Sequence, residues 1–181
     1  KKNKRYKITD CIPFFNENDL LEVRLNELDN IVDEFIIVES MFTFSGNYKP
    51  FNFDENRFKK FMHKIKYVQL RKVPTGYEYK DIWARENHQR LMTKDLVSPD
   101  TDIVISTDID EIPNVDTIRN YRPEMGLRYL EMSLYYYWIN CYASQWFEAK
   151  IIGYQDYLKM NPVEVRNTNC PKLEGPDGWH F

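Results

Sequence analysis

The segment DIVISTDIDEIP, from Asp102 to Pro113, carries three acids within four positions, directly after an apolar run. These acids are Asp108, Asp110 and Glu111. Their mutual repulsion is tolerable only if the loop is fully solvated or if a positive group lies among them. Two carboxylates separated by one residue can both point at one divalent cation, which prefers oxygen ligands. We therefore interpret the segment as a Mn²⁺ or Mg²⁺ site that leaves coordination positions for substrate phosphates.

Other acid-rich motifs fit this segment less well. An EF-hand loop starting at Asp108 needs a glycine and a glutamate where the sequence has Pro113 and Arg119. A haloacid-dehalogenase-like phosphotransferase also has an Asp-x-Asp motif after an apolar strand, but that motif opens the fold and is followed by a later acidic pair. We keep this class as an alternative. In a third interpretation the acids only help to cap the next helix, beside Asn114 or Asp116.

Strand and helix patterns alternate along the chain before the acidic segment. Leu21, Leu25 and Leu28 recur at helical spacing, and FIIVES at 35–40 is a continuous apolar run typical of a buried parallel strand. The order β-α-β-α-β-α-β predicts an α/β fold with a mostly parallel sheet flanked by helices. We expect strands at 7–14, 35–40, 66–70 and 102–106, and helices at 15–32, 54–65 and 82–96.

Finer features are predicted from local patterns. Asp19 and Glu22 are spaced as in a helix capping box. After the acidic segment we expect a short helix at 114–121 and one or two strands within 127–139. The Asn-, Pro- and Gly-rich tail from Asn161 is typical of a loop.

The ends of the expected strands place further polar groups near the acids. Ligands of open α/β sheets bind at the carboxyl ends of the strands. The acidic segment follows the fourth expected strand, Glu39 lies at the end of the second, and Asn16 and Glu17 follow the first. We expect these side chains to face one rim of the sheet.

Length, composition and net charge limit the class of protein and the partners that it can bind. With 181 residues, 43% hydrophobic and 29% charged, the chain is typical of one globular domain. A net charge of −3 disfavours nucleic acid as a partner, and no apolar run is long enough for a membrane span. Three scattered cysteines indicate neither a zinc site nor a disulfide framework. The compartment stays open between the cytoplasm and a lumen reached with an anchor that is later removed.

Read from end to end, the chain resembles glycosyltransferase family 17. The blocks that carry the resemblance are FFNENDLLEVRLNELDNIVDEFIIVES, TFSGNYKPFNF, WARENHQR, DIVISTDIDEIP and GWHF, with a looser match over 121–169. The resemblance implies a GT-A-type fold, with a Rossmann-like nucleotide-binding half and a smaller acceptor part. It also implies inverting, metal-dependent transfer of a sugar from a UDP-sugar, UDP-N-acetylglucosamine in that family, to a hydroxyl of a glycan or glycoprotein acceptor.

Domain organisation follows the same resemblance. We expect one domain over 1–181, with a disordered tail at 1–6, a nucleotide-sugar-binding part at 7–113 and an acceptor-side part at 114–181. Family members usually continue past GWHF, which leaves open whether the C-terminal part is complete. A carbohydrate-binding protein that kept the fold and lost turnover is a second alternative.

Under this interpretation the metal and donor contacts can be assigned to residues. Asp110 is the expected metal ligand, with Asp108 sharing the metal or reaching the ribose. His180, in GWHF, is expected to be a further ligand or a phosphate contact. Glu39 is expected to accept from the uracil or ribose, with an ion pair to an arginine as the alternative, and Asn16 and Glu17 to touch the nucleotide.

The remaining assignments concern the diphosphate and the base. Arg85 is expected to reach the diphosphate, and Glu86 with Arg90 to form a solvated i, i+4 pair. Glu111 is the first candidate for the base. Asp177 is the second, in a Gly-rich tail that can close over the site together with Glu174. Half of the aromatic run at 135–138 is expected to face a sugar and half the core.

Overall fold

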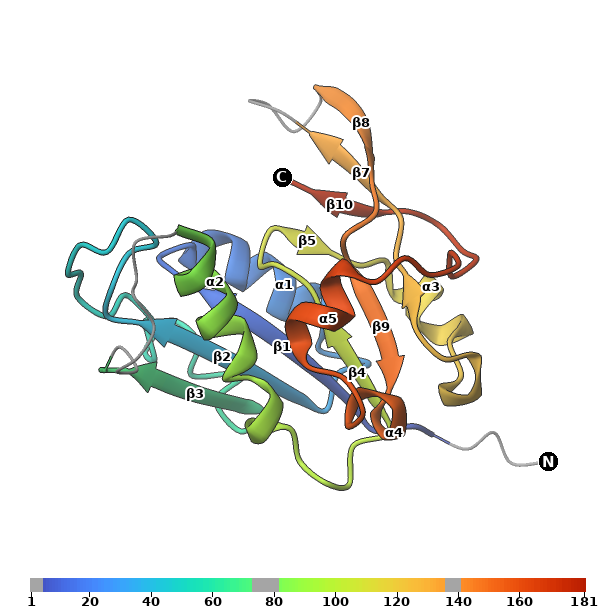
Figure 1. The fold of residues 1–181 in the computed structure, drawn as a ribbon, viewed down its shortest axis with the longest axis horizontal. Helices are drawn as coiled ribbons and strands as arrows, with labels where there is room; N and C mark the ends of the chain where they lie inside the picture. Colours follow the sequence, from blue (N-terminus) through green and yellow to red (C-terminus); the bar gives the residue numbers. More distant parts are fainter. Residues whose placement is uncertain (1–4, 73–81, 136–140) are drawn as a thin grey trace.

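The computed structural model describes residues 5–72, 82–135 and 141–181. Its centre is a six-stranded sheet in the order β3-β2-β1-β4-β9-β6 (Figure 1). Pairing is parallel from β3 to β4 and antiparallel from β4 through β9 to β6. The prediction of an α/β fold with a mostly parallel sheet is confirmed. The strands are β1 (Ile8–Phe14), β2 (Glu34–Ser40), β3 (Ile65–Leu70), β4 (Ile103–Ser106), β6 (Arg128–Tyr129) and β9 (Lys150–Gly153).

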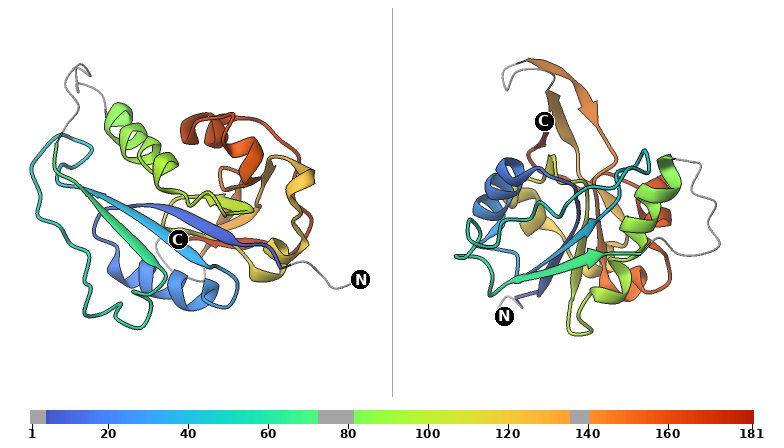
Figure 2. Two further views of the ribbon diagram at one scale, coloured as in Figure 1. Left: turned by 90° about the horizontal axis from the view of Figure 1, so that it is seen from below. Right: turned by 90° about the vertical axis from the view of Figure 1, so that its left-hand side faces the viewer.

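Both faces of this sheet are covered. Alternate residues of β2 divide between two cores: Phe35 and Ile37 pack with the leucines of α1 (Asn18–Leu28), whereas Ile36 and Val38 pack on the opposite side. That second core contains Val165 of α5 (Pro162–Asn167). Figure 2 shows α1 on one side of the sheet and α2 (Ile82–Leu91) with α5 on the other. Two buried faces explain why these strands read as continuous apolar runs.

A second, four-stranded sheet projects from the carboxyl edge, in the order β5-β10-β7-β8. It consists of β5 (Glu111–Ile112), β7 (Met132–Tyr135), β8 (Tyr142–Trp146) and β10 (Gly178–His180). Because β10 pairs with β5, the end of the chain lies against the acidic segment. The remaining helical elements are α3 (Val115–Asn120), α4 (Tyr154–Tyr157) and 3₁₀ turns at 94–96 and 123–125.

Two predictions of secondary structure were wrong. Residues 55–64 form successive turns instead of a helix, with i→i+3 bonds such as Phe61 N to Phe58 O at 2.8 Å. A period of three places Phe58 and Phe61 on the same side of these turns, and both are buried in the core. The tail from Asn161 is not all loop: it contains α5, which Asn161 itself caps, and β10.

Helix ends also departed from expectation. The helix expected at 15–32 begins at Asn18, and no side chain caps it, so the Asp19–Glu22 capping box is absent. The helix expected at 82–96 ends at Leu91 before a 3₁₀ turn. Asn114 does cap α3, accepting from Asp116 N at 2.9 Å.

The expected disordered tail at 1–6 and the aromatic run at 135–138 are only partly covered by the described residues. Residues 1–4 of the tail lie outside the described residues, whereas Arg5 pairs with Asp33 at 2.7 Å and Tyr6 packs against the core. In the aromatic run, Tyr135 stacks on Phe181, and 136–138 lie outside the described residues. No helix in the described part of the chain is long and apolar enough to cross a membrane.

Candidate active site

A buried ion pair under the carboxyl edge holds the acidic segment in place. Arg24 of α1 and Asp10 of β1 are fully buried, and two guanidinium nitrogens meet the two carboxylate oxygens at 2.8 Å each. The same guanidinium donates to the carbonyl oxygens of Asp108 and Glu111, at 2.9 and 2.7 Å, and to the Thr107 hydroxyl. One cation therefore fixes the backbone of the loop from below, and it satisfies carbonyl groups that burial would otherwise leave unpaired.

Glu111 is the most enclosed of the three acids, with a fully buried side chain. One oxygen accepts from the Trp146 indole at 2.5 Å and from Arg166 at 3.1 Å. The other accepts from the Asp108 backbone N–H at 2.7 Å and from Arg166 at 3.2 Å. Donors therefore surround both oxygens, and the hydrogen bonds of this carboxylate connect β5 with Trp146 of β8 and Arg166 of α5.

Asp108 is held between two arginines. Arg90 and Arg166 each approach one of its oxygens at 2.6 Å. Burial by itself would raise the pKa of Asp108, but the charges of Arg90 and Arg166 outweigh burial and bring this pKa below its ordinary value. Arg90 also meets Glu86 at 3.1 Å, but its side chain is only 3% exposed, so the expectation of a solvated pair was wrong.

Asp110 is the most open acid of the loop, with 35% of its side chain exposed. Its carboxylate lies 3.4 Å from Nε2 of His180, which β10 brings opposite Glu111. The His180 ring packs against Trp146 at 4.7 Å between centroids, and its Nδ1 is buried without a hydrogen-bond partner in the described structure. Burial would lower the pKa of His180, but the hydrogen bond and charge of Asp110 raise it above its ordinary value.

A cavity of about 190 Å³ opens beside this pair. Its aromatic walls include Phe15, after β1, and Phe44, whose rings lie 27° from parallel with centroids 6.5 Å apart. Asp108, Asp110 and Glu17 contribute carboxylates to the same cavity. Apolar ring faces next to an acidic, metal-compatible loop suit a ligand with a planar base and a charged group.

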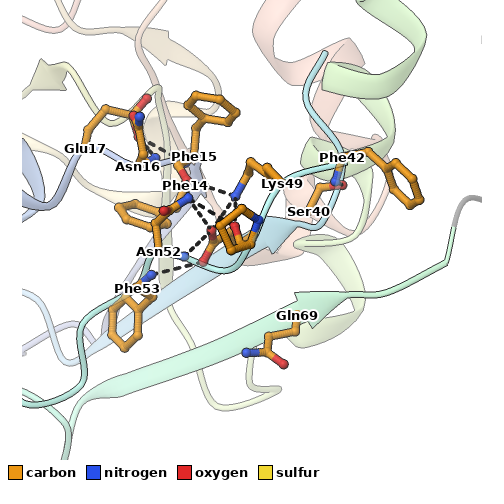
Figure 3. Close-up of polar contacts among 12 residues, drawn as sticks. Phe14, Phe15, Asn16, Glu17, Ser40, Phe42, Lys49, Asn52, Phe53 and Gln69 are labelled. Atoms are coloured by element: carbon orange, nitrogen blue, oxygen red, sulfur yellow. Dashed lines mark hydrogen bonds and ion pairs between the residues drawn. The ribbon is translucent and has the colours of Figure 1, made fainter. Parts of the chain in front are cut away.

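Glu39 ends a neighbouring strand but is fully engaged by the protein. Its carboxylate accepts from Lys49 at 2.5 Å, from the backbone N–H groups of Asn52 and Phe53 at 2.8 and 3.2 Å, and from the Tyr67 hydroxyl at 2.6 Å. Figure 3 shows Lys49, Asn52 and Phe53 gathered around these polar contacts. Burial and the Glu39 bond raise the pKa of Tyr67. Of the two expectations for Glu39, this arrangement matches an ion pair, with lysine in place of arginine.

The other expected donor contacts lie around the same rim. Glu17 lines the 190 Å³ cavity while accepting from the N–H groups of Phe15 and Asn16, at 3.0 and 2.9 Å, so it also shapes the turn. Asn16, next to Glu17 in the same turn (Figure 3), is exposed. Arg85 donates to the Phe44 carbonyl at 2.5 Å, which places it behind the aromatic wall of the cavity.

The expected lid segment is anchored to α3. Asn120 donates to the Glu174 carbonyl at 3.0 Å, and the Asp177 carboxylate accepts from Gln145 at 3.2 Å. Lys172 lies 3.8 Å from the same carboxylate. Asp177 therefore lies directly before β10, three residues before His180, and its described contacts are to the small sheet and its neighbours.

Asp10, Arg24 and Arg166 belong to the site but were not predicted from the sequence. Two signals were available: Asp10 is a charge inside a strand expected to be buried, and Arg24 falls on the apolar stripe three residues after Leu21. Such a pair indicates charges that meet in the interior. Arg166 had no comparable signal, because it lies in the tail that was expected to be loop.

Among the described residues, no group of three or more His, Cys, Asp or Glu side chains is arranged to hold a metal ion. Asp108 faces arginines, which leaves Asp110 and His180 as the pair with metal-compatible donors. A 3.4 Å contact is long for a good hydrogen bond. It is close to the separation of roughly 3 Å between neighbouring ligands of an ion bound at about 2.1 Å. The two side chains fit a divalent ion that takes its other ligands from substrate and water.

Comparison with a solved structure agrees with this architecture and defines a GT-A-like fold. The 4-diphosphocytidyl-2C-methyl-D-erythritol synthase of Anaerococcus prevotii aligns with a TM-score of 0.52 at 10% identity, covering 98% of this chain and 90% of that one. At this identity the likeness concerns the fold alone.

Sequence comparison then gives the family. The model of glycosyltransferase family 17 matches residues 1–180, and the chain belongs to that family. The beta-1,4-mannosyl-glycoprotein 4-beta-N-acetylglucosaminyltransferases of rat and human are each 37% identical over 123 residues, or 62% of this chain. The chain spans less than a quarter of either relative, at 22% and 23% of their lengths. Family membership argues against the haloacid-dehalogenase-like alternative.

Proposed function

We propose that this chain transfers a sugar from a nucleotide-sugar donor to a hydroxyl of a glycan or glycoprotein, with UDP-N-acetylglucosamine as the expected donor. The observation that carries the proposal is the open Asp110–His180 pair beside the aromatic cavity, at the carboxyl edge of the sheet. Family membership and the activity for which the rat and human relatives are named support the same reaction class.

Asp110 and His180 are the residues that would hold a Mn²⁺ or Mg²⁺ ion. Such an ion supplies charge stabilisation for the departing diphosphate. Asp108, kept ionised between Arg90 and Arg166, fixes the loop that presents Asp110. Asp108 also lines the cavity, and each carboxylate oxygen has a second lone pair with which it can accept from a ribose hydroxyl.

Phe15 and Phe44 bind the base of the donor in this proposal. Their rings supply apolar faces at the rim, and Glu17 shapes the turn that carries Phe15. Arg85 acts indirectly, because its bond to the Phe44 carbonyl positions that wall. Glu39 and Asn16 then matter for the shape of the rim more than for contacts with the donor.

An inverting transfer needs a base that removes the proton of the acceptor hydroxyl as the hydroxyl attacks opposite the diphosphate. Between the two candidates we favour Asp177. Donors surround both Glu111 oxygens, whereas Asp177 has a carboxylate that is 29% exposed, on the segment that carries His180. Glu111 instead keeps Arg166 and Trp146 in place around the loop.

The test is donor turnover. The protein is incubated with a panel of UDP- and GDP-sugars, with and without Mn²⁺, and free nucleotide diphosphate and melting temperature are measured. We expect metal-dependent release from a UDP-sugar that Asp110→Ala abolishes. Metal-dependent stabilisation by a donor without turnover on any glycan would favour the carbohydrate-binding alternative. Release of phosphate from simple phosphomonoesters would favour a phosphotransferase.

A further inference from the structure

A second cavity is lined by Arg166, the arginine that pairs with Asp108 and Glu111 of the acidic loop. It has a volume of about 370 Å³ and is formed by the start of β9, the end of α5 and the loop that follows α5; we call it the β9–α5 cavity. Its lining residues are Tyr129, Phe147, Glu148, Lys150, Arg166 and 167–170. None of these residues was predicted from the sequence to bind a ligand.

Lys150 is the unusual group in this cavity. The residue is only 5% exposed, and its ammonium donates to the Phe147 carbonyl at 2.7 Å. No carboxylate in the described parts of the chain lies within ion-pair distance of it. An ammonium group carries three donors, and burying such a charge is costly unless it is paired. Burial accordingly lowers the pKa of Lys150.

The neighbouring charges partly offset one another. Arg166 adds a second cation to the wall, although Asp108 and Glu111 already pair with it. Glu148 lines the same cavity and acts on Lys150 at longer range than an ion pair. Lys150 thus remains the cation with unused donors, and Glu148 is the group that opposes binding of an anion.

The walls suit a sugar as well as a charge. Tyr129 and Phe147 lie edge to face with ring centroids 5.6 Å apart, and Asn167 and Asn169 supply amide groups. Apolar ring faces with a few polar groups are the usual lining of carbohydrate sites.

The two cavities share one ion pair. Asp108 lines the 190 Å³ cavity, Arg166 lines the β9–α5 cavity, and their side chains meet at 2.6 Å. If the donor occupies the first cavity, a ligand in the second lies against the arginine that pairs with Asp108 of the donor cavity, and so next to the reacting centre.

We propose that the β9–α5 cavity binds an anionic substituent of the acceptor sugar, a phosphate, sulfate or carboxylate, with Lys150 as its main donor. The identification of this ligand as the acceptor rests on the proposed function. The binding of an anionic group is independent of that function, because it can be measured without a donor.

The first experiment uses Cys170 as a reporter in the unaltered protein. Cys170 is a partly exposed free thiol that lines the cavity, and the exposed Cys141 is an internal reference. Alkylation of both is followed by mass spectrometry with inorganic phosphate, a hexose phosphate or neutral methyl mannoside present. We expect the hexose phosphate to slow labelling of Cys170 most, inorganic phosphate less and the mannoside least, with Cys141 unchanged.

Two variants, one removing a positive and one a negative charge, test whether Lys150 binds the anion and Glu148 opposes it. Lys150→Met keeps the length of the side chain and removes its charge, so we expect it to weaken hexose phosphate binding about tenfold or more, the range of a charge-assisted hydrogen bond. Glu148→Gln removes the opposing charge and should strengthen binding about two- to threefold. Lys59→Met is the matched control, because Lys59 is exposed and does not line the β9–α5 cavity; this variant should bind as the parent does.

The outcomes separate this inference from the proposed function. Protection of Cys170 without sugar transfer would sustain the anion site and count against the transferase. Transfer to neutral mannoside with no anion-dependent protection would overturn the anion site alone. Protection by UDP that Lys150→Met removes would assign the cavity to the donor and also overturn it. If Lys150→Met fails to fold, Glu148→Gln decides, and unchanged affinity there contradicts the inference.

Discussion

Two strand ends at the same edge of the sheet carry acids with opposite fates. At the end of β2, Glu39 is fully buried and meets a lysine, a tyrosine and two backbone N–H groups. After β4, Arg90, Arg166 and Trp146 engage Asp108 and Glu111, but Asp110 stays one-third exposed beside His180. A strand-end carboxylate is therefore available to a ligand only where the protein does not supply hydrogen-bond donors to its oxygens.

Glu39 and Asp110 should contribute to different properties, Glu39 to stability and Asp110 to function. A buried carboxylate with internal partners should matter for folding. The more open Asp110 carboxylate, whose described side-chain contact is the long one to His180 Nε2, should matter for chemistry. Substitutions at the two sites should therefore move different quantities.

The largest effect is expected for Asp110→Ala. Loss of the more open metal-compatible carboxylate should lower turnover by about 10²–10³-fold, the scale for removing one group that stabilises developing charge. The melting temperature should change little, because the described side-chain contact of Asp110 is the long one to His180. Asp116→Asn, in an exposed ion pair on α3, is the matched control. Equal turnover in Asp110→Ala and the parent would remove the basis of the proposed site.

Glu39→Gln should show the opposite pattern. The change leaves Lys49 buried without its counter-charge, and we expect the free energy of unfolding to fall by about 3 kcal/mol. Urea denaturation measures the loss, and turnover per folded molecule should stay within about threefold of the parent. If turnover is lost while stability is kept, Glu39 contacts the donor as first predicted from the sequence.

Gly178→Ala should disturb the open site without removing any of its groups. A Cβ at this position would lie 2.4 Å from the Ile112 carbonyl, so β10 must shift away from β5 and carry His180 with it. We expect about a tenfold loss of turnover. Gly126→Ala is the control: it has space but a φ of 69°, so it should lower stability by about 1 kcal/mol and leave turnover of the folded protein unchanged. Similar turnover in both variants would show that the β5–β10 approach is not needed.

The smallest effect is the shift in melting temperature on adding Mn²⁺. At about ten times its dissociation constant, the ion should stabilise the parent by about 1.4 kcal/mol, or roughly 3–5 °C for a chain of this size. The shift should persist in Glu39→Gln and vanish in Asp110→Ala. A shift that survives in Asp110→Ala would place the ion elsewhere.

The sequence predicted much of the sheet and part of the site. Apolar runs such as FIIVES identified the parallel strands, because a strand buried on both faces needs apolar residues at every position. Local periodicity was less reliable at 55–64, where a spacing of three fits tight turns as well as a helix. The tail was misjudged because α5 and β10 are short and are stabilised by contacts with distant segments.

By itself, the sequence determined that acids gather at the carboxyl edge of a parallel sheet, since strand order and loop position are encoded in nearby residues. Only the tertiary structure decided what each acid meets. Arg24, Arg90, Arg166 and His180 come from elements far apart in the chain. Arg24 holds the loop carbonyl groups, Arg90 and Arg166 engage Asp108, and Arg166 also engages Glu111, whereas Asp110 has only the long contact to His180. A carboxylate pairs inside the protein if hydrogen-bond donors lie within a few ångströms of it, and otherwise it remains available to a ligand. The local sequence does not specify which distant donors come that close.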